Sequence, residues 1–343
     1  MNVNVDSLRG VGPTQGRAGG TVRSESGRTP PAGTTPGGLG RSHAVSVRSP
    51  YRLDLTASVL RRLSTNLVDV LTPDGEYVRV LSGIAGPAIV RARQVGPDTL
   101  AIAVEGDARD HAAALATARR VLGVEIDLRR FYRSAARVRW LWPLVRRMWG
   151  VKPPRYPTVW EACANAIVFQ QISLIAASAI MSRIVVALGQ CRERDGVRLY
   201  CFPGVEQVQG ADDATLRAAG LSAGKLATLR RVGDTIGSGV LDEAVLEEHS
   251  TPTAAALLRG IKGIGPWTAA VILLRGLGRL DVFPANDTSV GRNLAFVRGS
   301  APFDLEAVLD ALGPDRGMLY YHLLLARLEA RGDIGRASVE RRA

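Results

Sequence analysis

Asp287 and Trp267 are the two residues whose types and spacing best fit chemistry on a bound ligand. Asp287 lies in the loop Asp281–Thr288 and follows Trp267 by twenty residues. A helix of about ten residues spans ~15 Å, and a loop of similar length can return that distance, so both residues can share one cleft. A carboxylate in a partly dry cleft stabilises a developing cation or orients a water molecule. The simpler alternative is an acidic cap on the next helix.

A Gly-Ile-Gly turn precedes Trp267 and joins two helical patterns. The first pattern, Ala254 to Ile261, is followed by Gly263, which adopts positive φ after a helix without a Cβ clash. Gly265 allows close backbone approach, and Pro266 suits the first position of a new helix. Free backbone N–H groups at the positive end of that helix suit a phosphate. An ordinary helical hairpin is the alternative.

The charge of the chain favours a polyanionic partner. The net charge is +12, and the excess is almost all arginine, since lysine occurs only at Lys152, Lys225 and Lys262. Each neutralised phosphate releases counterions, so nucleic acid is the first expectation, with a generally basic surface as the alternative. The chain has 343 residues, of which 46% are apolar. That length allows two domains with proper cores.

Other sequence features bear on the compartment. No run of about 18 uncharged apolar residues predicts a membrane span, and the start of the chain does not resemble a secretory signal. The three cysteines, Cys163, Cys191 and Cys201, have no paired metal-binding spacing. Their number fits a reducing compartment without disulfides, so we expect a cytoplasmic, nucleoid-associated protein.

The composition of the chain divides it into four parts. We predict a disordered basic tail at 1–50, an α+β domain at 51–126, a helical domain at 127–333 and a flexible tail at 334–343. In the α+β domain, Tyr51–Leu55 alternates like a strand and Ala57–Leu63 resembles a short helix. Three further strands and the helix Asp110–Leu122 then predict an antiparallel sheet.

Aromatic residues and arginines alternate in Leu128–Trp149. This composition is found in nucleic-acid-binding surfaces, but we favour core packing beneath an arginine-rich face. The apolar stretch Trp160–Leu188 breaks at Gln170 and Gln171, and Ser173 can cap the helix that follows. Glutamines exposed at such a junction can probe DNA, whereas buried ones need partners.

Ser222 can cap the helix that follows it. That helix carries Lys225 and Arg230, which can either contact phosphate or remain solvated helix charges. No phosphate loop, HExxH motif or nucleophile elbow occurs in the sequence. The four histidines form no ligand pattern; His322 is predicted to be a core residue.

Four motifs, in this order along the chain, resemble those of the helix-hairpin-helix DNA glycosylases. Within that family they are most similar to the DNA-3-methyladenine glycosylase II group. They are FQQIS, GLSAGKLATL, LLRGIKGIGPWTAAVILLRGLGRLDVFPANDTSVGR and RGMLYYHLLLARL, and they span about Trp160 to Glu329. The resemblance extends more weakly to Tyr51–Gly123, where that group carries a TATA-binding-protein-like α+β domain. It implies an α+β fold with this small antiparallel sheet domain followed by a mostly α-helical glycosylase domain.

The resemblance also implies roles for individual residues. Asp287 matches the family's catalytic aspartate, and Trp267, Val271 and Thr288 match positions of the base pocket. Because Trp267 replaces the lysine nucleophile of bifunctional relatives, strand cleavage is disfavoured. Gln171 matches the side chain inserted in place of a flipped base.

The expected DNA contacts and metal ligands follow from the same motifs. DNA-binding residues are expected at Gln170, Gln171, Lys262, Gly263, Ile264, Gly265 and Thr268. The carbonyls of Ile261 and Ile264 are expected to hold a structural monovalent cation. No cofactor is expected to be required, and the four-cysteine iron–sulfur loop of other relatives is absent from the sequence.

Three positions depart from the family pattern. Thr288 replaces a tyrosine, Val271 an aromatic residue and Asp315 a pocket tryptophan, so the base pocket is less aromatic. We predict a monomeric, monofunctional N-glycosylase that flips alkylated purines out of damaged double-stranded DNA during base-excision repair, with no membrane partner. The alternatives are a glycosylase for uracil, hypoxanthine or an oxidised base, and a non-catalytic lesion-binding protein.

Overall fold

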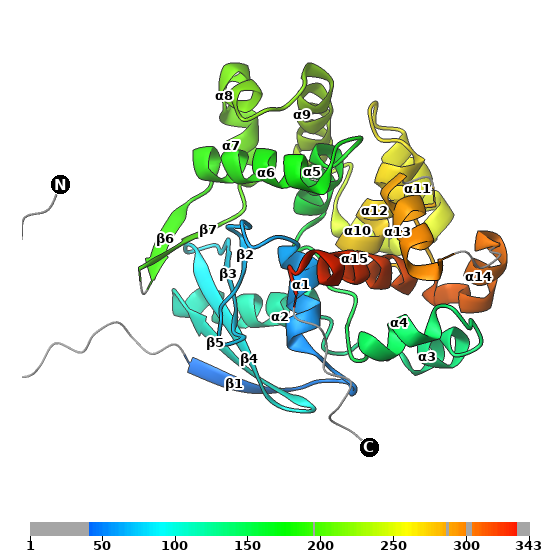
Figure 1. Ribbon diagram of the computed structural model, residues 1–343. Coiled ribbons are helices and arrows are strands. Elements are labelled where there is room, and N and C mark those ends of the chain that lie inside the picture. Colours follow the sequence, from blue (N-terminus) through cyan, green and yellow to red (C-terminus); the bar gives the residue numbers. More distant parts are fainter. Residues whose placement is uncertain (1–40, 195, 286–287, 300–303, 335–343) are drawn as a thin grey trace, which may run out of the picture. The chain divides into compact units, whose positions relative to one another are not determined.

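Five antiparallel strands in the order β1-β5-β4-β3-β2 form the sheet of the N-terminal part (Figure 1). The computed structural model describes residues 41–194, 196–285, 288–299 and 304–334. The strands are β1 (Arg41–Ser46), β2 (Asp69–Leu71), β3 (Tyr77–Leu81), β4 (Ala88–Gly96) and β5 (Thr99–Glu105). The antiparallel sheet predicted from the sequence is therefore confirmed.

Strand β1 lies within the stretch that we predicted to be disordered, so that prediction is wrong for Arg41–Ser46. The strand pairs with β5 along its whole length. Val45 of this strand and Val47 just after it are buried. Two alternating apolar residues are too few to predict an edge strand from the sequence. The rest of the predicted tail, residues 1–40, and the end of the chain from residue 335 lie outside the described residues.

Helices α1 (Leu53–Arg61) and α2 (His111–Val121) pack against the sheet. The prediction of a strand at Tyr51–Leu55 is wrong, because α1 buries two faces. Leu53, Ala57 and Leu60 pack into the sheet core. Leu55, Val59 and Leu63 pack into the core of the C-terminal helices. A five-residue window through such a helix alternates like a strand.

The rest of the chain is mostly helical and surrounds two cores. The first core holds α5 (Val159–Val168), α9 (Ala223–Gly237), α11 (Thr251–Arg259) and α12 (Pro266–Gly276). Around it lie α6 (Leu174–Leu188), α7 (Val205–Gly210), α8 (Asp213–Ala218) and α10 (Glu243–Glu248). All ten residues of α5 are buried, because this helix is surrounded by its neighbours.

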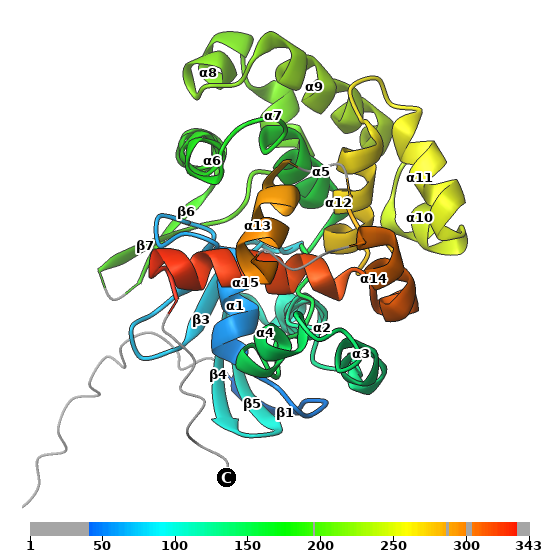
Figure 2. The ribbon, with the colours of Figure 1, turned by 45° about the vertical axis from the view of Figure 1, so that its right-hand side comes forward.

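The second core holds the helices α3 (Arg129–Ala135), α4 (Trp142–Arg147), α13 (Thr288–Arg298), α14 (Leu305–Leu312) and α15 (Met318–Arg331). Figures 1 and 2 show α15 running beside α1, and α13 and α4 also pack against it. Phe131 and Tyr132 are buried, as core packing predicts, while Trp149 is half exposed. His322 is wholly buried in this core, as predicted.

The strands β6 (Cys191–Arg194) and β7 (Val197–Tyr200) form a hairpin that we did not predict from the sequence. Its strands are short, and most of its side chains are exposed, so no apolar alternation marks it. Among the described residues, no helix is long and apolar enough to cross a membrane.

Candidate DNA-binding and active site

The hairpin turn between α11 and α12 has the local geometry that its glycines predict. Gly263 has φ +103°, and a Cβ there would lie 2.0 Å from the Thr228 Oγ1 of α9. Only glycine combines that φ with such close packing. Gly265 is extended, with open space where a Cβ would be, and Pro266 is the first residue of α12. The Ile264 N–H donates to the Ile261 carbonyl at 3.0 Å and closes the turn.

Gln170 joins the turn to the loop between α5 and α6. Its Nε2 donates to the Gly263 carbonyl at 3.1 Å and to the Thr268 Oγ1 at 2.8 Å. Thr268 is buried in the first turn of α12. Three residues predicted to contact DNA are thus brought together, although one lies more than 90 positions before the others.

Gln171 follows at the outer end of this loop. Its side chain is exposed, and its φ is +55°, which few residues other than glycine adopt. Ser173 then caps α6 by accepting from the Ala176 N–H, as predicted. A strained, exposed residue between two capped helices is consistent with a functional contact.

Lys225 and Arg230 bind the protein itself, so neither of the sequence alternatives describes them. The Lys225 Nζ donates to the carbonyls of Val168 and Gln170, both at 2.8 Å. Desolvation lowers the pKa of Lys225, and its charge lies at the negative C-terminal end of α5. Arg230 donates to the carbonyls of Gln209 and Ala211. The predicted cap by Ser222 had already located Lys225 in the first turn of α9, but its partners are distant in sequence.

Trp267 and Val271 lie one turn apart on α12. Trp267 is partly buried against the first core, and Val271 is 3% exposed. Arg275, a further turn along, is wholly buried; its guanidinium stacks over Tyr156 with 4.7 Å to the ring centroid. Asp287 and the side chain of Thr288 lie outside the described residues, so their predicted roles remain predictions.

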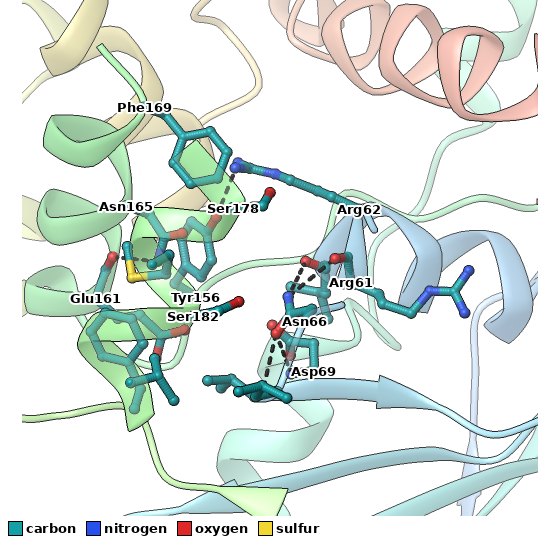
Figure 3. Close-up of a pocket in the computed structure, with 16 residues that line it drawn as sticks. Arg61, Arg62, Asn66, Asp69, Tyr156, Glu161, Asn165, Phe169, Ser178 and Ser182 are labelled. Carbon is teal, nitrogen blue, oxygen red and sulfur yellow. Dashed lines mark hydrogen bonds between the residues drawn. The ribbon is translucent and has the colours of Figure 1, made fainter. Parts of the chain in front are cut away.

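A small cavity lies between α1, α5 and α6 (Figure 3). It adjoins residues 168–171, the last residue of α5 and the start of the connection to α6, which we call the 168–171 loop. The volume of the cavity is about 40 Å³, which suits one or a few water molecules and not a nucleobase. In its wall the Arg62 guanidinium donates to the Tyr156 hydroxyl at 3.0 Å and stacks on Phe169, 4.2 Å from the ring centroid. Phe169 directly precedes Gln170, so α1 supports this loop from the side of the sheet.

Known proteins resemble the chain in sequence and structure. No model of a known protein family matches it. A Mycobacterium tuberculosis protein named "Probable bifunctional transcriptional activator/DNA repair enzyme AlkA" is 30% identical over 86% of this chain and 57% of its own length. A Bacillus subtilis DNA-3-methyladenine glycosylase is 27% identical over 50% of this chain and 57% of its own length. The chain thus spans little more than half of these relatives.

A 3-methyladenine DNA-glycosylase from Archaeoglobus fulgidus has a similar structure. The TM-score is 0.71 with 26% identity, over 83% of this chain and 98% of that one. Sequence and structure therefore identify the same group. In both respects the chain resembles the AlkA-like helix-hairpin-helix DNA glycosylases.

Asp315, which we predicted to replace a pocket tryptophan of the family, has a structural role in this protein. Asp315 is buried, and its carboxylate accepts from the Arg130 Nε at 2.6 Å and Nη2 at 2.9 Å. This bidentate pair joins α3 to the short 3-10 turn Gly313–Asp315 before α15. Asp315 thus forms an ion pair between two segments of the second core.

The donor set at the hairpin fits the monovalent cation that the glycosylase family implies. The Ile261 carbonyl accepts one hydrogen bond and has a second lone pair. Carbonyl oxygens are uncharged, hard ligands, which suit such an ion. Among the described residues, no group of three or more His, Cys, Asp or Glu side chains could hold a metal ion.

Proposed function

We propose that this protein is a monofunctional DNA glycosylase that releases alkylated purines of the 3-methyladenine type from double-stranded DNA in base-excision repair. The observation that carries the proposal is the Gln170 bridge between the hairpin turn and the α5–α6 loop. Through this bridge, two segments that we propose to contact DNA lie side by side in a chain that resembles named alkyl-base glycosylases.

The hairpin supports DNA binding through its backbone. Gly265 leaves the start of α12 open, and the N–H groups there lie at the positive end of a helix, where a phosphate is favourable. Lys262 is exposed beside the turn and adds a positive charge. Gln171 would occupy the gap that the flipped nucleotide leaves in the duplex.

Asp287 is the proposed catalytic residue. As the bond between the base and C1′ breaks, the base leaves with the bonding electrons and the sugar becomes an oxocarbenium-like cation. The Asp287 carboxylate would stabilise that cation and help place the water whose oxygen bonds to C1′. The water's proton is released, and an abasic site remains in an intact strand.

Trp267 supports release without strand cleavage, since a Schiff base needs a lysine amine and this position has none. Of the three lysines of the chain, Lys262 is exposed beside the turn and the other two are held within the protein. Lys152 is wholly buried and donates to the Ile126 carbonyl at 2.7 Å. Lys225 is held by two carbonyls. Trp267 takes the position of the lysine in bifunctional relatives, and its ring can stack on a cationic alkylated base.

The proposal includes two accessory points. The Ile261 and Ile264 carbonyls would hold a monovalent cation that stiffens the hairpin, and no other cofactor is required. The protein would act as a monomer. It would act on the nucleoid in the cytoplasm, because the proposed DNA substrate lies there.

Base release from single-lesion duplexes tests the function. Wild-type protein should release 7-methylguanine and 3-methyladenine, and Asp287→Asn should lower the rate by at least about a hundredfold. An unchanged rate for Asp287→Asn would refute the assigned role. Borohydride trapping of a covalent protein–DNA complex would refute the monofunctional mechanism.

A different lesion range is the second candidate, because Val271 and Asp315 make the pocket less aromatic than in relatives. Duplexes carrying uracil, hypoxanthine or an oxidised guanine, assayed beside the methylated ones, separate the two. Tight lesion binding without release of any base would instead indicate a non-catalytic lesion-binding protein.

A further inference from the structure

One face of α9 contacts both the hairpin turn and the 168–171 loop. Lys225, Thr228 and Arg231 recur every three residues and so lie on one side of the helix. Thr228 packs against Gly263, and the Arg231 Nη1 donates to the Lys262 carbonyl at 3.2 Å. The C-terminal part of this face therefore holds the turn.

The N-terminal end of the same face holds the loop. The Lys225 ammonium bonds to the carbonyls of Val168 and Gln170 at equal distances of 2.8 Å. These carbonyls are at the end of α5, where Val168 is the last helical residue. Two charge-assisted bonds from a partly buried side chain fix the backbone next to Gln171.

Gln170 completes a closed set of contacts. From a backbone that Lys225 holds, its side chain reaches across to Gly263 and Thr268. The helix, the loop and the turn each contact the other two. The 168–171 loop and the hairpin turn cannot shift relative to each other without breaking hydrogen bonds to buried or charged partners.

We infer that Lys225 and Gln170 are positioning residues that set the distance between the hairpin amides and the Gln171 side chain. This inference rests on the proposed function, in which the amides bind a phosphate and Gln171 fills the gap in the duplex. A fixed distance between these two contacts selects which nucleotide leaves the stack. Neither residue needs to touch the base or the reacting atoms.

The test uses the full chain and a duplex with a tetrahydrofuran abasic analogue opposite 2-aminopurine, whose fluorescence rises when stacking is disturbed. Lys225→Met and the near-isosteric Gln170→Met should each lose most of the fluorescence rise. Both should lower kcat for base release by about tenfold, with Kd for the duplex changed less than about threefold. Lys225→Arg should restore both signals, because a guanidinium can donate to the same two carbonyls.

Arg109→Met is the charge-matched control, since it removes one exposed cation whose side-chain bonds go to Asp107. It should have wild-type kcat and fluorescence. Wild-type fluorescence and kcat in both Lys225→Met and Gln170→Met would overturn the inference. If Lys225→Met does not fold, Gln170→Met decides. Absence of base release by the wild type would refute the proposed function alone, because the fluorescence comparison needs no bond cleavage.

Discussion

The Arg79 guanidinium of β3 donates to the Glu161 carboxylate of α5 at 2.5 Å, and both side chains are almost wholly buried. The same guanidinium binds Asp69 of β2 at 2.6 Å. Burial raises the pKa of Glu161, and the opposing charge of Arg79 offsets part of that rise. A buried ion pair thus joins the sheet to the central helix that ends at the 168–171 loop.

Arg79→Met should strongly destabilise the protein, because it leaves two buried carboxyl groups without a counter-charge. We expect the free energy of unfolding to fall by about 3–5 kcal/mol, measured by urea denaturation near neutral pH. Combining it with Glu161→Gln and Asp69→Asn should recover part of the loss. A loss below about 1 kcal/mol in the single variant would contradict the importance of this pair.

His322 should make stability depend on pH in the acid range. Its Nδ1 donates to the Met318 carbonyl at 2.8 Å, and burial lowers its pKa from 6.5 to about 4. The unfolded chain therefore binds more protons between these values, so the stabilisation present above pH 6.5 is lost as pH falls toward 4. The difference corresponds to about 3 kcal/mol.

Urea denaturation of His322→Leu across this pH range is the measurement. The variant should have a shallower decline in unfolding free energy than the wild type below pH 6.5. The variant His249→Gln, which removes an exposed histidine, is measured in parallel. It shows how much the loss of any histidine flattens the pH dependence of the unfolding free energy. Equal slopes for wild type and His322→Leu would show that the decline has another origin.

The two hairpin glycines should respond differently to alanine. Gly263→Ala combines a disfavoured φ with a Cβ that would overlap Thr228, so we expect a loss of stability of at least ~1–3 kcal/mol. The backbone at Gly265 is extended, and the Cβ that Gly265→Ala adds would lie in open space, so this variant should keep its thermal stability. If the Gly265 backbone contacts a phosphate, DNA affinity should nevertheless fall in that variant. Unchanged affinity would argue against that contact.

Trp267→Ala should discriminate between lesions by charge. A cation over a tryptophan face gains roughly 0.5–2 kcal/mol beyond ordinary stacking. The variant should therefore lose more kcat/KM on cationic 7-methylguanine than on neutral hypoxanthine, by about three- to tenfold. Trp267→Phe, which keeps an aromatic face, should lie between the two. Equal losses on both bases would mean that Trp267 does not recognise charge.

Local chemistry made much of this site predictable. The turn at Gly263, the start of α12 at Pro266 and the caps at Ser173 and Ser222 depend on residues within a few positions of each other. Backbone conformation and capping are short-range effects, so they can be read along the chain. The same reasoning predicted a helix only for the later part of α1 and a strand for its start, because the two buried faces of α1 depend on two separate cores.

Long-range packing decided the rest. The types of Gln170 and Lys225 indicated polar contacts, and for Lys225 the alternatives were a phosphate partner and solvation by water. Only the fold brings them to Gly263 and to the end of α5, because a hydrogen bond between distant segments depends on how α5, α9 and α12 pack together. The sequence by itself determined the hairpin and the candidate residues Asp287 and Trp267. The tertiary structure decided that the hairpin and the Gln171 loop form one supported unit, since no local interaction could connect them.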